Sequence, residues 1–191
     1  MPRPPNPDLE EQILKAARKL WKKGGGGALT MRAVAQAAGT NTPAVYRRFR
    51  DREDILRALL QIIRLEFGAV LKAASSPEEA CERYVDYGLS HPHEYELFYR
   101  HEYELFYSAR SLRAGARNTV GRPARDAMSQ RLVEKFGGVP EDHKRLNSSL
   151  WMLAHGATML MIGKTILPTE VQESRATFTA AVAALLQKHD L

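Results

Sequence analysis

Apolar residues recur at spacings of three and four along most of the chain, which is the period of an amphipathic helix. The first such stretch covers residues 8–23 and ends at the glycine run 24–27, because four residues without Cβ are costly to hold in a helix. A second helix is expected to begin after a Thr30 cap. A third helix, capped by Asn41 or Thr42, follows it closely.

Helical periodicity continues to the end of the chain. A long fourth helix is expected from Asp51 to about Ala74, because Asp51 and Asp54 have the spacing of a capping box. Gly156 has small neighbours and is expected to let two helices approach closely. No convincing alternating strand pattern occurs, so the sequence predicts an all-α fold. The later helical segments are 77–90, 93 to about 110, 119–136, 140–163 and 169–189.

The second and third helices are short and are joined by a tight turn that contains Gly39. This is the pattern of a helix-turn-helix, whose second helix can enter a DNA major groove about 12 Å wide. Val45 and Phe49, four residues apart, are predicted to face inward and to leave the opposite side of the helix to DNA. The candidate DNA contacts are Thr30, Thr42, Pro43, Ala44, Tyr46, Arg47, Arg48 and Arg52.

Each candidate contact follows from its side chain. Thr42 and Ala44 are small enough to approach base edges, and Arg47 can donate to a guanine. Tyr46 and Arg48 are better suited to phosphates, as are Thr30 and Arg52. Alternatively, Tyr46 covers the edge of the core, and the two neighbouring arginines are solvated charges that favour the helix dipole.

Positive charge is concentrated at the amino end. The chain has 28 Lys and Arg against 22 Asp and Glu, and residues 1–60 hold 12 of the first against 6 of the second. The excess of +6 therefore lies entirely in these residues, since the remaining 16 and 16 cancel. A basic head on a neutral body is typical of a polyanion-binding module, although a merely solubilising surface gives the same count.

Three strings carry a resemblance to a known family: ILKAARKLW at 13–21, VAQAAG at 34–39 and TPAVYRRF at 42–49. With Gly25 and the segment 51–56, they are similar to the N-terminal domain of the TetR family of transcriptional regulators, over residues 9–60. The resemblance implies phosphate contacts by Thr30 and Arg52, base contacts by Thr42 and Ala44, and a sugar-phosphate contact by Tyr46.

The chain departs from this family pattern at three positions. Gly26 stands where an aromatic residue is frequent, Asn41 where serine is frequent and Arg48 where histidine is common. These differences concern the stiffness of the first loop and the choice of operator sequence.

The body of the chain carries a second resemblance. Trp151, His155 and Gly156 form a Trp-x-x-x-His-Gly string that resembles the signature of the C-terminal ligand-binding domain in one TetR subgroup, WHG, as do His91-Pro92 and residues 95–98. His155 either offers its imidazole to a polar ligand or is a core histidine with a protein partner. An aromatic pocket for an organic effector is expected among Tyr84, Tyr87, Phe98, Tyr103, Phe106, Trp151 and His155.

The last two helices are rich in small and apolar residues. They are expected to pair with their copies in a homodimer. Such a dimer would place its two helix-turn-helix domains on successive turns of a near-palindromic DNA site. Alternatively, they only form the core of the monomer. The apolar residues in question are Leu150, Leu153, Ala157, Leu160, Met161, Val171, Phe178, Ala181, Val182 and Leu185.

The segment 93–99, HEYELFY, is repeated at 101–107. A shift of eight residues rotates a helix by about 80° beyond two turns, so the two copies cannot present the same face. We interpret the repeat as a tandem duplication that either lengthens the sixth helix by about 12 Å or is looped out. A metal site is not expected there, because two histidines eight residues apart do not share a helix face.

The remaining features exclude other classes. A single cysteine, Cys81, forms no internal disulfide, and no early apolar run resembles a signal peptide or a membrane span, so a cytoplasmic protein is expected. No catalytic constellation or cofactor motif occurs, and an enzyme is not expected. The predicted organisation is a disordered lead-in at 1–7, a helix-turn-helix domain at 8–54, and an effector-binding and dimerisation domain at 55–191.

The expected function is that of a DNA-binding regulator, in this family most often a repressor, which a small-molecule effector releases from its operator. The alternative is a helical sensor or scaffold of the same fold that reads no DNA sequence.

Overall fold

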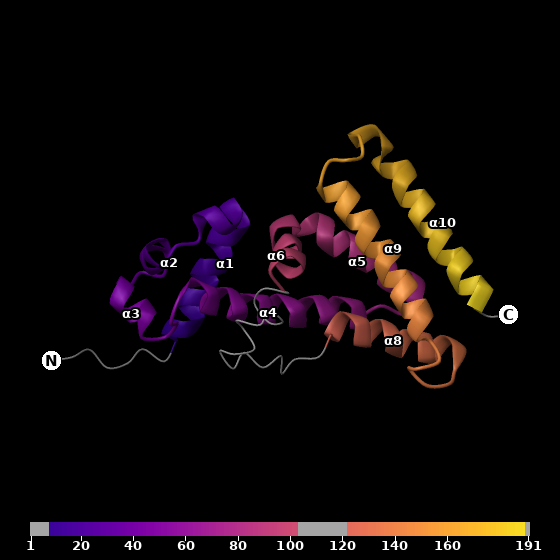
Figure 1. Cartoon of the computed structure of the whole chain (residues 1–191), viewed down its shortest axis with the longest axis horizontal. Coiled ribbons are helices and arrows are strands. Elements are labelled where there is room, and N and C mark those ends of the chain that lie inside the picture. Colours follow the sequence, from indigo (N-terminus) through magenta and orange to yellow (C-terminus); the bar gives the residue numbers. More distant parts are fainter. Residues whose placement is uncertain (1–7, 103–121, 190–191) are drawn as a thin grey trace. The chain divides into compact units, whose positions relative to one another are not determined.

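The computed structural model describes residues 8–102 and 122–189. Within these residues there is no strand, and the prediction of an all-α fold is confirmed. The helices are α1 (Leu9–Ala28), α2 (Met31–Ala37), α3 (Thr42–Tyr46), α4 (Arg52–Lys72), α5 (Pro77–Ser90), α6 (Pro92–Glu102), α8 (Pro123–Phe136), α9 (Lys144–Ile162) and α10 (Val171–His189), with a 3₁₀ turn at Pro168–Glu170 (Figure 1).

The chain forms two compact units. Of the described residues, the N-terminal unit holds 8–63 and 96–102, and the C-terminal unit holds 64–95 and 122–189. Helices α4 and α6 therefore contribute residues to both units.

The glycine run breaks the first helix, as its composition predicts. Helical turns continue to Ala28, but Gly24 (φ −151°, ψ 19°) and Gly25 (φ 56°, ψ −146°) have non-helical backbone angles. Gly25 is in the left-handed region, where a side chain is strained. The chain therefore kinks here before it enters the helix-turn-helix.

Polar side chains begin the next helices. Thr30 Oγ1 accepts a hydrogen bond from the backbone N–H of Ala33 at 3.1 Å, and Asn41 Oδ1 accepts one from Ala44 at 2.9 Å. Asn41 rather than Thr42 is thus the N-cap of α3. Each such bond satisfies a backbone donor that the helix itself leaves unpaired.

The start of α4 has the reciprocal pairing that its sequence predicts. Asp51 Oδ1 accepts from the N–H of Asp54 at 2.8 Å, and Asp54 Oδ2 accepts from the N–H of Arg50 at 3.1 Å. The return bond reaches Arg50 instead of the capping residue itself, but it fixes the same turn. Since this turn follows α3, the two hydrogen bonds stabilise the connection between the helix-turn-helix and α4.

The core of the N-terminal unit joins all four of its first helices. The predicted inward residues of α3, Val45 and Phe49, are both buried in it. Because α3 has only five residues, this burial and its cap are what hold it in a helical form that would be marginal in isolation. The other large members of the core are Ile13, Trp21, Leu29, Val34, Ile55, Leu56, Leu59, Leu60, Ile63 and Leu97.

In the C-terminal unit, α9 and α10 pack side by side as a hairpin, and α5 packs against both (Figure 1). Helices α5 and α9 approach each other closely at Gly88 of α5, where a Cβ would lie 2.3 Å from Thr158 Cγ2 of α9. The prediction for Gly156 is wrong, because a Cβ there would have no neighbour within 4 Å. A glycine in a helical sequence therefore does not by itself show where two helices approach closely, because that depends on which element faces it.

The described helices include none that is both long enough and apolar enough to span a lipid bilayer.

Candidate DNA interface and aromatic cluster

The outer side of α3 presents polar and aromatic side chains to solvent. Tyr46 is 54% exposed, Pro43, Arg47 and Arg48 are exposed, and Thr42 is partly exposed. Within the described residues, the side chains of Tyr46 and Arg47 make no hydrogen bond or ion pair. The exposure of Tyr46 argues against the alternative that it covers the core edge.

The predicted exposure of Ala44 is wrong. Its side chain is 4% exposed and lies buried beside Val45. In this short helix, which packs against α2, two consecutive positions, Ala44 and Val45, are buried. A base contact through the methyl group of Ala44 is therefore not available in this conformation.

Arg52 has a structural role that its sequence position does not reveal. Its Nε donates to the carbonyl oxygen of Leu29 at 2.9 Å, and its Nη2 donates to that of Gly26, also at 2.9 Å. A Cβ on Gly26 would lie 3.0 Å from Nη2 and 3.7 Å from the ring of Trp21. The missing side chain at Gly26 thus makes room for the guanidinium, which ties the loop after α1 to α4.

These bonds limit what Arg52 can offer to DNA. Two of its nitrogens already donate to the protein, so a phosphate contact would fall to its remaining N–H groups. Thr30 is in a similar position, because its hydroxyl oxygen accepts the capping bond while its O–H can still donate. Both residues therefore remain candidate phosphate contacts that also hold the local backbone.

Part of the basic excess is paired internally. Arg57 lies 3.4 Å from Asp54 and 3.8 Å from Asp51, and exposed Lys15 lies 2.7 Å from Glu11. The exposed Lys15–Glu11 pair contributes little to stability, but all of these pairs neutralise charge locally. Arg47 has no such partner among the described residues, and its charge stays available to a polyanion.

In the C-terminal unit, a cluster of aromatic residues connects α5, α6 and α9. We call the aromatic cluster Tyr84, Tyr87, Tyr95, Trp151 and His155, together with Phe67 of α4. The imidazole of His155 is parallel to the indole of Trp151 within 5°, at 5.8 Å between ring centres.

Tyr95 links the polar groups of the cluster. Its Oη donates to Tyr84 Oη at 3.2 Å and lies 2.8 Å from His155 Nδ1. His155 therefore has a protein partner, as the core-histidine alternative holds. Burial lowers the pKa of His155 below its ordinary value of 6.5, because the surroundings disfavour the charged imidazolium.

The structure brings together only part of the predicted effector pocket. Tyr84 and Tyr87 are buried, and Trp151 and His155 lie beside them in the aromatic cluster. The prediction for Phe98 differs, because its side chain packs against the core of the N-terminal unit. Tyr103 and Phe106 lie outside the described residues. Tyr95, which the predicted pocket omitted, is its central residue, and the only signal for it was its place in the family resemblance.

The last two helices divide their apolar residues between two faces. Leu150, Met161, Phe178 and Val182 are buried within the unit, so the inward face is monomer core. Leu160 of the predicted set is exposed, together with Met152. A self-association surface through these helices stays a prediction that rests on the outward face.

Two kinds of reactive site find no support here. Burial raises the pKa of the Cys81 thiol to about 12, which keeps it protonated and a poor nucleophile. Across residues 8–102 and 122–189, no three metal-ligating side chains of His, Cys, Asp or Glu gather at one place.

Comparison with known proteins assigns the chain. Residues 13–59 match the bacterial regulatory proteins of the tetR family, and residues 78–185 match the tetracyclin repressor-like C-terminal domain. The chain belongs to the TetR family. As a TetR-family protein it is a DNA-binding transcription regulator whose second domain binds ligand.

Solved structures share the fold of this TetR-family chain. A Rhodococcus sp. RHA1 protein of unknown function has 22% identity and a TM-score of 0.71, with 98% of this chain and 97% of that one covered. TetR from Acinetobacter baumannii AYE has 15% identity and a TM-score of 0.61, with 92% and 93% covered. The multidrug binding protein EbrR, complexed with ethidium, has 18% identity and a TM-score of 0.62, with 95% and 99% covered. No curated protein matches the sequence.

Proposed function

We propose that this TetR-family regulator is a homodimeric repressor that reads a near-palindromic operator through α3. The observation that carries the proposal is the outer face of α3, where Tyr46 and Arg47 are exposed and bind nothing else among the described residues. Thr42 is the candidate for base contact, Tyr46 for the sugar-phosphate backbone, and Arg47 for either a guanine or a phosphate. Pro43, Arg48, Thr30 and Arg52 complete the proposed footprint.

The fold alone supports no particular operator, so the first experiment is unbiased. The full chain would be used to select bound fragments from random duplex DNA, and the recovered half-sites would be compared for symmetry. We expect two inverted half-sites about one helical turn, roughly 34 Å, or a multiple of it apart. Recovery of no common sequence would instead favour the scaffold alternative.

Salt dependence separates the two alternatives further. A regulator that neutralises several phosphates loses affinity steeply as salt rises, because counterions are released on binding. We expect the selected fragment to stay preferred over random DNA at every salt concentration at which binding is measurable. Equal affinity for both fragments would contradict sequence reading while leaving the fold unchanged.

We infer that the effector enters the C-terminal unit at the aromatic cluster. A variant of the Acinetobacter TetR was solved in complex with minocycline and EbrR with ethidium, which makes these two compounds suitable first probes. The WHG subgroup is part of this proposal, since Trp151 and His155 of its signature lie in the cluster. On this proposal, an effector that reaches the buried tyrosines displaces the Tyr95 hydroxyl from His155.

Isothermal titration would test the effector site on the full chain. A compound that binds there should lose affinity about tenfold or more in Trp151→Ala, because base and ring stacking are worth roughly 1 to 3 kcal/mol. The same compound should release the selected DNA fragment. Met152→Ala, one residue further along α9 and exposed, is the matched control and should bind the compound as wild type does.

A further inference from the structure

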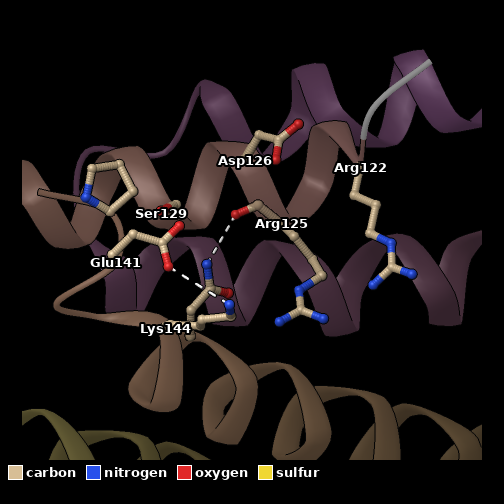
Figure 2. A pocket seen from close by; sticks show the side chains of 8 residues that line it. Arg122, Arg125, Asp126, Ser129, Glu141 and Lys144 are labelled. Atoms are coloured by element: carbon tan, nitrogen blue, oxygen red, sulfur yellow. Dashed lines mark hydrogen bonds and ion pairs between the residues drawn. The ribbon is translucent and has the colours of Figure 1, made fainter. Parts of the chain in front are cut away.

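A second candidate site lies at the start of α8, apart from the aromatic cluster. It is a surface cavity of about 300 Å³, a size at the lower end for small-molecule sites (Figure 2). Half of its lining comes from α8 and its N-cap, and half comes from residues 140–147, where the chain enters α9. The cavity is therefore built from two elements of the same unit.

One side of the cavity is cationic. Arg122 is the N-cap of α8, and its side chain makes no hydrogen bond or ion pair within the described residues. Arg125 is held in place, since Nη2 donates to Ser148 Oγ at 2.9 Å and the guanidinium lies 5.4 Å from the centre of the Trp151 ring. Figure 2 shows the side chains of Arg122 and Arg125 extending in the same direction from α8. The N-terminal end of the helix adds to the positive potential, so this side suits a carboxylate.

Asn147 supplies an acceptor that lacks a donor. The residue is only 7% exposed, and its Nδ2 donates to the carbonyl oxygen of Arg125 at 3.1 Å, which fixes the orientation of the amide. Its Oδ1 is buried and has no hydrogen-bond partner in the part of the chain that the structure describes. Buried acceptors of this kind are rare in proteins, because they lose their bond to water without replacement. A ligand that donates an N–H or O–H in the cavity would satisfy it.

The opposite charge is also present. Asp126 and Glu141 are also among the residues that line the cavity, and Glu141 lies 3.6 Å from Lys144 in an exposed pair. Asp126 has no side-chain partner within the described residues. A wall with carboxylates next to arginines disfavours a simple anion such as phosphate, which would be repelled at one end.

We propose that this cavity binds a small free amino acid. The carboxylate of the bound amino acid faces Arg122 and Arg125. Its ammonium group donates to Asn147 Oδ1 and lies near Asp126. The arrangement uses both signs of charge and satisfies the buried Oδ1 of Asn147. A hydroxy acid shares the carboxylate and a donor, but it lacks the positive charge that Asp126 favours.

The binding test uses the full chain with its asparagine side-chain amides labelled for NMR. L-Serine, lactate, acetate and inorganic phosphate are titrated separately. We expect L-serine to saturate one site per chain and to shift the Asn147 amide resonance, lactate to bind more weakly, and acetate and phosphate to bind at least tenfold more weakly than L-serine. Acetate or phosphate binding as tightly as L-serine, or no saturation by L-serine at millimolar concentration, would overturn the proposal.

Variants assign the site. Arg122→Gln and Asp126→Asn should each weaken L-serine binding about tenfold, since each removes one charge from a charge-assisted contact. Neither side chain has a partner among the described residues, so folding should be unaffected. Arg145→Gln is the matched control, because Arg145 is exposed on α9 but does not line the cavity. Equal weakening by Arg122→Gln and Arg145→Gln would show a nonspecific charge effect and sink the assignment.

Discussion

The tyrosines that matter most in the two units of this TetR-family protein have opposite surroundings. In the N-terminal unit, Tyr46 stands on the outside of α3 with more than half of its surface exposed. In the C-terminal unit, Tyr84 and Tyr95 are buried and joined by a hydrogen bond. The first is ready to meet a partner without rearrangement, whereas the second can meet one only if internal contacts give way.

This difference teaches how the two functions can share one chain. A rigid, capped reading helix keeps its outward side chains in position and loses little entropy on binding. A packed aromatic cluster instead has two possible sets of partners, internal and external, and such an exchange is what couples a ligand to a change of shape. Four substitutions or conditions test the contrast.

The largest effect is expected from overpacking the C-terminal unit. Gly88→Ala would place a Cβ 2.3 Å from Thr158 Cγ2 and 3.2 Å from the ring of Tyr95. We expect a loss of about 2 kcal/mol in the free energy of unfolding, measured by urea denaturation. In a Thr158→Ala background the contact with Cγ2 is removed and only the contact with Tyr95 remains, so the same change should cost about 1 kcal/mol. Equal costs in both backgrounds would contradict the tight contact.

The next effect concerns the exposed reading surface. Tyr46→Ala should lower affinity for the selected operator about tenfold, or about 1.4 kcal/mol. It should also lower affinity for random DNA, because a contact to the sugar-phosphate backbone carries no sequence information. Thr42→Ala should change base preference instead, as seen by repeating the selection. Neither should alter the free energy of unfolding by more than about 0.5 kcal/mol. If Tyr46→Ala destabilised the fold, the tyrosine would belong to the core after all.

A smaller effect is expected inside the aromatic cluster. Tyr95→Phe removes the hydroxyl that lies between Tyr84 and His155 while keeping the ring. We expect a loss of about 1 kcal/mol in stability, the usual net value of a hydrogen bond, with operator affinity unchanged in the absence of effector. Tyr46→Phe removes an exposed hydroxyl and is the matched control, with no expected change in stability. A stability loss of the same size in the control would remove the contrast between the two units.

The smallest effect is a pH dependence at His155. Its pKa is lower in the folded protein than its ordinary value of 6.5, so the unfolded chain takes up the proton first as the pH falls. The stability that the neutral imidazole contributes is fully present above pH 6.5. It is lost as the pH falls from 6.5 through the lowered pKa of the folded protein. Wild type should therefore lose more stability than His155→Gln between neutral pH and about pH 5, measured by denaturation at each pH. Parallel curves would mean that His155 titrates as it does in the unfolded chain.

Local signals account for what the sequence predicted well. The caps at Thr30 and Asn41 and the reciprocal turn at Asp51 depend on residues three or four positions apart, and they are found as the pattern indicates. The inward pair of α3, Val45 and Phe49, follows from the same short-range period. These features can be read from the sequence because the partner of each residue is its near neighbour.

The predictions that failed depend on the facing element. Ala44 is buried on a short helix that packs against α2, and Gly88 rather than Gly156 marks the close approach of two helices because Thr158 lies opposite it. Arg52 reaches carbonyl oxygens 23 and 26 residues earlier in the chain, a distance at which no periodic pattern carries information.

The position of Arg125 has a practical consequence. The same guanidinium that lines the cavity at α8 also lies over the indole of Trp151. A ligand that draws the Arg125 guanidinium toward itself changes the charge next to the Trp151 ring. We expect this change to shift the wavelength of the Trp151 fluorescence emission. The other tryptophan, Trp21, is 3% exposed in the N-terminal core and supplies a steady background. We therefore expect amino-acid binding at the proposed site to shift tryptophan fluorescence, which can be measured without an attached dye.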